Sequence, residues 1–212
     1  MKLLRRRRII RAFLVLGVAL LVLSAVGVGC ADALILPPIP KNVGWDGAVR
    51  RQFIVDAERV EYFVARSPGA VRKEPTAFVL RFTGDAAGAA KFTASRWTDH
   101  PVEVWMVNYP GYGGSDGPRT LRQLGRVSLA AFDELKRVAG DRPIFLEGFS
   151  LGTVPALSVA ARRNVGGCII QNPPPLRQLI LARHGWWNLW TLALPVAMSV
   201  PDEFDSIRNA KH

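Results

Sequence analysis

The chain has few of the residues that hold metals or form disulfide frameworks. It contains two cysteines, Cys30 and Cys168, and three histidines, His100, His184 and His212. Cys30 ends an apolar run and Cys168 lies in an expected buried strand, so we expect no disulfide bond between them. The histidines form no ligand cluster, and no zinc-ligand spacing occurs. The sequence therefore predicts neither a metal site nor a bound cofactor.

Acidic residues are also few. The chain has 17 Asp and Glu and 28 Lys and Arg, which gives a formal net charge of +11. Six of the basic residues precede the first apolar run, at position 2 and within 5–11. Elsewhere arginine is scattered, without the basic stripe interleaved with aromatic residues that is typical of nucleic-acid-binding surfaces. We therefore expect no nucleic-acid partner.

The basic cluster at 5–11 is followed by an apolar run at 12–28. Positive charge stays in the cytoplasm while an apolar run enters the bilayer, so this pattern is typical of a signal or membrane-insertion segment. A run of about 17 residues lies between a signal-peptide core and a full span of about 20. We expect the membrane as a partner and the rest of the chain outside the cytoplasm, at a bacterial inner membrane or in the periplasm.

Three fates of this N-terminal segment, residues 1–33, stay open. It can remain as an uncleaved anchor helix. It can be a signal peptide cleaved after Ala31-Asp32-Ala33, which has a small-x-small pattern. It can also be lipidated at Cys30, because the run Gly27-Val28-Gly29-Cys30 is similar to a bacterial lipobox. Residues 34–48 follow as a proline-rich linker that cannot continue a helix and is expected to lead away from the membrane in extended form.

The globular domain is expected at 49–212, where strands alternate with helices. It starts with a β-hairpin, since two short β-type runs are separated by Asp56-Ala57-Glu58. The expected strands are 52–55, 59–65, 77–82, 102–107, one starting at 144, and 167–171, and the expected helices are 86–97, 120–138 and 151–163. This alternation predicts an α/β fold, with a mostly parallel sheet covered by helices on both faces.

The motif Gly148-Phe149-Ser150-Leu151-Gly152 lies between an expected strand and an expected helix. In that setting G-x-S-x-G indicates a nucleophile elbow, where a strained backbone exposes the serine hydroxyl. The residues two before and two after the serine must be small, so that strand and helix can pack closely. Gly148 and Gly152 meet that demand. The alternative, a loop serine between two flexible glycines, does not account for the flanking strand and helix.

A second motif, Asn108-Tyr109-Pro110-Gly111-Tyr112-Gly113-Gly114-Ser115, follows the strand at 102–107. With the elbow and the order of elements between them, residues from about 50 to 212 resemble the α/β-hydrolases, in particular their membrane-anchored serine hydrolases. The resemblance implies a serine hydrolase that acts on a small acyl substrate, a carboxylic ester or thioester, through an acyl-enzyme on Ser150. It also implies that the backbone N–H of Leu151 and one from the loop after 77–82 hold the oxyanion.

That oxyanion loop reads Thr83-Gly84-Asp85, where the family usually has His-Gly. Gly84 permits the close backbone approach that an oxyanion donor needs. Asp85 would bring a negative charge toward the oxyanion if it faced inward. We favour the alternative that Asp85 caps the helix expected to follow.

The resemblance implies an acid and a histidine on loops after strands that come later than the serine. Only 41 residues, 172–212, follow the last expected strand. Of these, 176–200 is an apolar, tryptophan-rich segment that fits a cap over an acyl pocket, or equally aromatic packing on the sheet. A triad of Ser150, Asp205 and His212 has the right order, but seven residues cannot span the elements that separate acid from base. His100 and His184 are weaker alternatives, one at the wrong end of the sheet and one in the cap.

We therefore expect an α/β-hydrolase domain that is C-terminally incomplete, preceded by an N-terminal apolar helix. Since neither the triad acid nor the base is identified, catalysis should be weakened by about 10⁴- to 10⁶-fold. The alternative is a non-catalytic fragment or pseudoenzyme of the same fold, tethered to the membrane and at most binding acyl or lipid ligands. A third hypothesis is a purely structural tethered domain.

Overall fold

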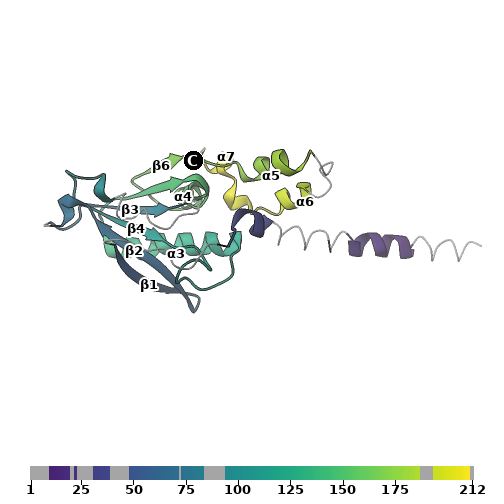
Figure 1. Cartoon of the computed structure of the whole chain (residues 1–212), viewed down its shortest axis with the longest axis horizontal. Helices are drawn as coiled ribbons and strands as arrows, with labels where there is room; N and C mark the ends of the chain where they lie inside the picture. The colour runs from purple at the N-terminus through teal and green to yellow at the C-terminus, as the bar shows by residue number, and fades with distance from the viewer. Residues whose placement is uncertain are drawn as a thin grey trace, which may run out of the picture.

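A six-stranded β-sheet forms the centre of the protein (Figure 1). The computed structural model describes residues 10–19, 22, 31–38, 48–71, 73–83, 94–186 and 193–210. The strands are β1 (Val49–Val55), β2 (Glu58–Arg66), β3 (Ala77–Phe82), β4 (Val102–Val107), β5 (Ile144–Phe149) and β6 (Gly167–Gln171). They lie in the order β1-β2-β4-β3-β5-β6, in which β2 is antiparallel to both neighbours and the remaining pairs are parallel. The prediction of a mostly parallel sheet is confirmed.

The predicted hairpin consists of β1 and β2, joined by a tight turn at Asp56 and Ala57. Both turn residues have positive φ angles, 47° and 67°. Two consecutive left-handed residues give the turn a twist that matches that of the flanking strands. The hairpin therefore adds an antiparallel edge to the otherwise parallel sheet.

Helix α3 (Leu121–Ala139) begins and ends at the signals that the sequence contains. The Thr120 side chain accepts a hydrogen bond from Gln123 N, which satisfies one of the free N–H groups of the first turn. At the other end Gly140, at φ 61°, turns the chain out of the helix without the steric cost of a side chain. The prediction of a helix over 120–138 is confirmed.

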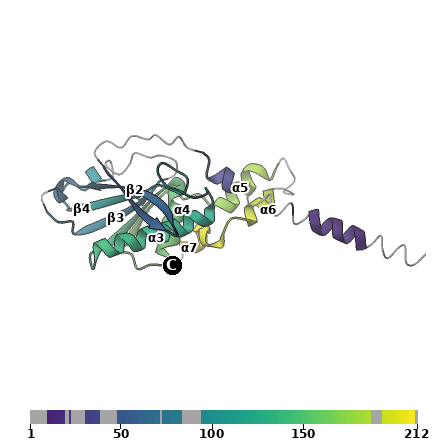
Figure 2. The same ribbon diagram turned by 90° about the horizontal axis from the view of Figure 1, so that it is seen from below.

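The two faces of the sheet are covered differently in the described residues. Helices α3 and α4 (Thr153–Ala160) both pack on one face and enclose the main core with β3, β4 and β5 (Figures 1 and 2). On the opposite face Ala94 and Trp97 pack on a smaller cluster around Val104. Most of the helix expected at 86–97 lies outside the described residues, since only 94–97 of that range is described.

A buried ion pair joins β3 and β5 on the side of this smaller cluster. Arg81 and Glu147 are register partners, and the Arg81 guanidinium donates to Glu147 Oε1 at 2.7 Å. Arg96 donates to the same oxygen at 3.1 Å. Both Arg81 and Glu147 are buried, so the carboxylate is stabilised by its partners rather than by water.

Residues 31–38 pack on the domain, although the sequence suggests an extended linker from residue 34. Residues 31–35 are helical, and Ala31 and Leu36 are only 1% and 2% exposed. Asp32 Oδ1 accepts a hydrogen bond from Leu121 N at 2.8 Å, at the start of α3. The Tyr112 hydroxyl donates to Pro37 O at 2.7 Å. The segment is therefore held by buried apolar contacts and by hydrogen bonds to two distant parts of the chain.

Within the part of the chain that the structure describes, no helix is both long enough and apolar enough to cross a membrane. Residues 10–19 are helical and mostly exposed. Much of the expected insertion segment, at 20–21 and 23–28, and the candidate lipidation site Cys30 lie outside the described residues.

The C-terminal region forms two small groups of helices. Helices α5 (Leu176–His184) and α6 (Ala193–Met198) pack together beside residues 31–36, beyond the end of the sheet (Figures 1 and 2). The short helices η3 (Asp202–Phe204) and α7 (Ser206–Asn209) pack on α4, with Phe204 buried. Trp186 is 75% exposed, while Trp187 and Trp190 lie outside the described residues.

One expectation about the core is wrong. The sequence places Cys168 in a buried strand, but its side chain is exposed. The strand itself, β6, has the predicted bounds, yet it pairs only with β5 in the described part of the chain. A strand at the edge of a sheet has neighbours on one side only, so its apolar composition does not ensure burial.

We expect Glu147→Leu to lower the free energy of unfolding by about 3 kcal/mol, because it removes a buried carboxylate from the charged Arg81. Adding Arg81→Met should restore most of the loss, since both buried charges are then gone. Urea denaturation measures both variants. As a control, Glu134→Leu removes a pair with the exposed Arg137, where a change of about 0.5 kcal/mol is expected. Equal losses in the single and double variants would contradict this account of the pair.

We expect Asp32→Ala to lower the free energy of unfolding by about 1 kcal/mol, as the loss of a side-chain cap does at other helices. Asp32→Asn keeps an oxygen acceptor for Leu121 N and should therefore lose less. Thermal unfolding of the full chain compares the two. If both substitutions leave stability unchanged, residues 31–38 are not fastened to α3 in solution.

Candidate active site

Ser150 lies at the carboxyl end of β5, where the strand turns into the helical stretch η2 (Ser150–Gly152) and then α4. Its φ angle is 51°, in the left-handed region. A non-glycine residue held in this region costs about 1–3 kcal/mol, a strain that concentrates at functional sites. The Thr153 hydroxyl donates to the Ser150 carbonyl at 2.7 Å, which braces the turn from the helix side. Ser150 thus has the backbone geometry of a nucleophile elbow.

Gly148 and Gly152 are required by close backbone packing around the turn. A Cβ atom at Gly148 would lie 2.6 Å from Thr153 Cα, so a side chain there would push α4 away from β5. A Cβ atom at Gly152 would overlap the Phe82 carbonyl and approach Thr83 N to 2.8 Å. The elbow therefore lies directly against the end of β3, where the expected oxyanion loop begins.

The two expected oxyanion donors are described to different extents. Leu151 is half-buried at the start of the helical stretch, where backbone N–H groups have no partner within the helix. Thr83 follows β3 and lies against the elbow. Gly84 and Asp85 lie outside the described residues, so their roles stay predictions.

The turn at 108–115 reaches the same region through Tyr109. The Tyr109 hydroxyl donates a hydrogen bond to the carbonyl of Thr83. Burial raises the pKa of this hydroxyl well above its usual value, so it stays protonated and remains a donor. The tyrosine thereby fixes Thr83, the residue at which the expected oxyanion loop leaves β3.

Glu61, on β2, holds this turn in place from inside. Its buried carboxylate accepts hydrogen bonds from Asn108 Nδ2 at 2.5 Å and from Gly114 N at 2.8 Å. The Ser115 hydroxyl donates to Asn108 O at 3.0 Å and accepts from Glu61 N at 2.9 Å. The sequence does not indicate that Glu61 and Tyr109 support the site, although it does contain the turn motif that they hold.

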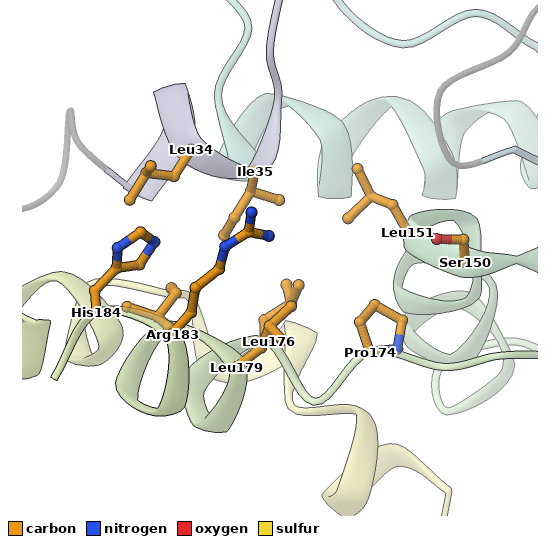
Figure 3. Close-up of a pocket in the computed structure, with 10 residues that line it drawn as sticks. Leu34, Ile35, Ser150, Leu151, Pro174, Leu176, Leu179, Arg183 and His184 are labelled. Atoms are coloured by element: carbon orange, nitrogen blue, oxygen red, sulfur yellow. The ribbon is translucent and has the colours of Figure 1, made fainter. Parts of the chain in front are cut away.

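A pocket of about 380 Å³ opens beside the elbow (Figure 3). In Figure 3 the Ser150 hydroxyl points into it, and the Leu151 side chain lies next to the serine. Residues from α5 form one wall and residues 34–35 form the opposite wall. The aliphatic lining residues are Leu34, Ile35, Leu151, Leu176, Leu179 and Ile180, joined by Pro174, Arg183 and His184. The pocket is therefore mostly apolar, with its polar side chains at Ser150 and near the end of α5.

The residues weighed as acid or base do not meet at Ser150. Figure 3 shows His184 at the opposite end of the pocket from the serine. His100 comes just before β4, where its carbonyl accepts a hydrogen bond from Ser67 Oγ. Because β4 and β5 run in the same direction, His100 lies at the opposite end of the strands from Ser150. Asp205 caps α7, accepting from two backbone N–H groups at 3.1 Å each, and His212 lies outside the described residues. Among the described residues, no carboxylate lines the pocket, and no cluster could hold a metal ion.

No family model matches the chain. Parts of it are similar to α/β-hydrolase domain proteins. A segment of 72 residues is 35% identical to the α/β-hydrolase domain-containing proteins aho-3 of Caenorhabditis elegans and 17B of Homo sapiens. A segment of 91 residues is 32% identical to the lysophosphatidylserine lipase ABHD12 of Gallus gallus. These segments are 33%, 33% and 38% of the chain, but only 22%, 25% and 23% of the respective relatives. The chain thus matches about a quarter of each relative's length.

Solved structures share the fold over a larger part of the chain. An α/β-hydrolase from Vibrio vulnificus matches with a TM-score of 0.57 and 20% identity, over 78% of this chain and 60% of that one. The esterase Pf2001 from Pyrococcus furiosus matches with a TM-score of 0.54 and 15% identity, over 80% and 70%. A serine hydrolase homologue from Coxiella burnetii gives 0.51 and 18%, over 70% of both chains. Shared fold and sequence similarity together show that the chain belongs to the α/β-hydrolase superfamily.

Proposed function

We propose that the chain is a serine hydrolase that cleaves a carboxylic ester or thioester through an acyl-enzyme on Ser150. The observation that carries the proposal is the elbow itself. Ser150 is held at φ 51° at the carboxyl end of β5, with its hydroxyl directed into an apolar pocket. A strained serine that is aimed into a pocket suits nucleophilic attack better than it suits a structural role.

In the proposed reaction Ser150 Oγ attacks the carbonyl carbon of the substrate. The negative charge that develops on the carbonyl oxygen is stabilised by the N–H of Leu151, and such donors are each worth about 3 kcal/mol. The serine proton passes to a base and from it to the leaving alcohol or thiol. Water then hydrolyses the acyl-enzyme, which gives a carboxylic acid and restores the serine hydroxyl. No described residue close to Ser150 in the pocket is a base, so we expect turnover far below that of a complete triad.

The lining of the pocket favours a substrate with an apolar chain. Aliphatic side chains occupy both walls between Ser150 and the end of α5. Arg183 adds a positive charge, since its guanidinium extends toward Ile35 between His184 and Leu176, and this charge suits a substrate with an acidic group. The name of the related lysophosphatidylserine lipase is in keeping with a lipid-like ester of this kind.

The second candidate function is acyl or lipid binding without catalysis. It is favoured by one observation, that no carboxylate lines the described pocket and that His184 lies at its opposite end from Ser150. The apolar walls would then hold a ligand whose ester bond stays intact. Covalent labelling of the serine separates the two functions.

We expect an alkyl fluorophosphonate to label the full chain at Ser150, since the elbow presents the hydroxyl to the pocket. Peptide mass spectrometry should find the adduct on Ser150, and Ser150→Ala should abolish it. Ser199→Ala is the control, because Ser199 is also half-buried but does not line the pocket. Absence of labelling in well-folded protein would favour the non-catalytic function.

We also propose that residues 1–33 attach the chain to a membrane, with the domain outside the cytoplasm. The support is the order of the basic cluster and the apolar run in the sequence. The double substitution Val15→Asp with Leu20→Asp should release the chain from the membrane fraction, because each charge opposes insertion by about 3 kcal/mol. Ile54→Asp, at an exposed site on β1, should leave it in that fraction. Retention of the double variant in the membrane fraction would contradict the proposed attachment. Protection of the domain from protease added to spheroplasts would contradict its proposed position outside the cytoplasm.

A further inference from the structure

The wall of the pocket opposite α5 comes from residues that precede the sheet. Leu34 and Ile35 line the pocket together with Ser150, although more than a hundred residues separate them in the sequence. In Figure 3 both side chains extend toward the pocket, Leu34 on the side of His184 and Ile35 on the side of Arg183, two residues of α5. A segment that the sequence suggests is a linker therefore forms part of the site.

This wall is fixed in place on the domain. Ala31 and Leu36, on either side of the lining residues, are buried in the main core. The hydrogen bond from Leu121 N to Asp32 Oδ1 fastens the segment to α3, and the bond from Tyr112 to Pro37 O fastens it to the turn at 108–115. Such a braced surface can select a ligand by shape, because little ordering is needed when the ligand binds.

Leu34 keeps half of its surface exposed, whereas Ala31 and Leu36 of the same segment are buried. It is 52% exposed, and Ile35 is half-buried. Leu36 is a member of the main core and Ile35 packs against it in part, which leaves the rest of the Ile35 side chain free to contact a ligand. The exposed apolar surface of Leu34 and Ile35 faces the pocket, where an apolar chain would cover it and gain from its removal from water.

We propose that Leu34 and Ile35 are specificity-determining residues of the Ser150 pocket, which contact the apolar chain of the substrate and select long chains over short ones. The proposal rests on the proposed function for the kind of substrate, since the chain that they contact belongs to the ester that Ser150 attacks. The segment at 31–38 is thus a part of the site rather than a connection to it.

The first test compares the labelling rates of the full chain by decyl and ethyl fluorophosphonate. Truncating both side chains, Leu34→Ala with Ile35→Ala, should lower the decyl-to-ethyl rate ratio by about tenfold, because only the decyl chain reaches them. The ratio is the readout because a general change in the reactivity of Ser150 alters both rates alike and cancels. Ile207→Ala is the matched control, since Ile207 is 51% exposed and lies outside the pocket. An unchanged ratio in the double variant overturns the proposal.

The second test needs no catalysis. In a Ser150→Ala background, the fluorescent fatty acid cis-parinaric acid should bind about tenfold more weakly when Leu34 and Ile35 are truncated. If no protein is labelled but this loss is seen, the proposed hydrolysis fails while the wall stands. If labelling occurs but neither the rate ratio nor the binding responds, the wall fails while the hydrolase stands. Leu34→Ala alone serves where the double variant does not fold.

Discussion

The contact between Gly152 and the end of β3 is the constraint on which the site depends. The helix that follows Ser150 starts so close to the Phe82 carbonyl that no side chain fits between them. This distance determines where the strained serine stands relative to the loop after β3. It also fixes α4 over the sheet, and with it the packing of η3 and α7 on that helix. A single close approach of two backbones thus orients the serine and the elements that surround it.

Buried polar groups on β2 and after β4 support this contact from the side of β3 that faces away from β5. Glu61 on β2 holds the turn at 108–115, and Tyr109 of that turn holds the Thr83 carbonyl. Each bond pairs a polar group that is wholly or partly buried, and a buried polar group left unpaired costs about 1–3 kcal/mol. The hairpin is therefore more than an added edge of the sheet, because its carboxylate positions the residues next to the elbow.

Much of the fold could be predicted from the sequence because its signals are local. The α3 boundaries depend on Thr120 and Gly140, and the bounds of β6 on a short apolar run. The exposure of Cys168 could not be predicted, since it depends on which strands pair with β6. The placement of residues 31–38 depends on Asp32 meeting a helix 89 residues later, a contact that a proline-rich run does not indicate. At the site the sequence indicated the elbow, whereas Glu61 and Tyr109 act through contacts that only the folded chain brings about.

Because Asp32 is hydrogen-bonded to the start of α3, the distance between the pocket and any group attached at residue 30 is short. Two extended residues span at most about 7 Å. A lipid or a helix end at residue 30 would therefore keep the domain within about that distance of the attachment point. Leu34 and Ile35, which line the pocket, come only two and three residues after Asp32. A domain attached in this way could not move far from its attachment point. If residues 1–30 attach it to a membrane as proposed, it would meet ligands that diffuse in the plane of that membrane.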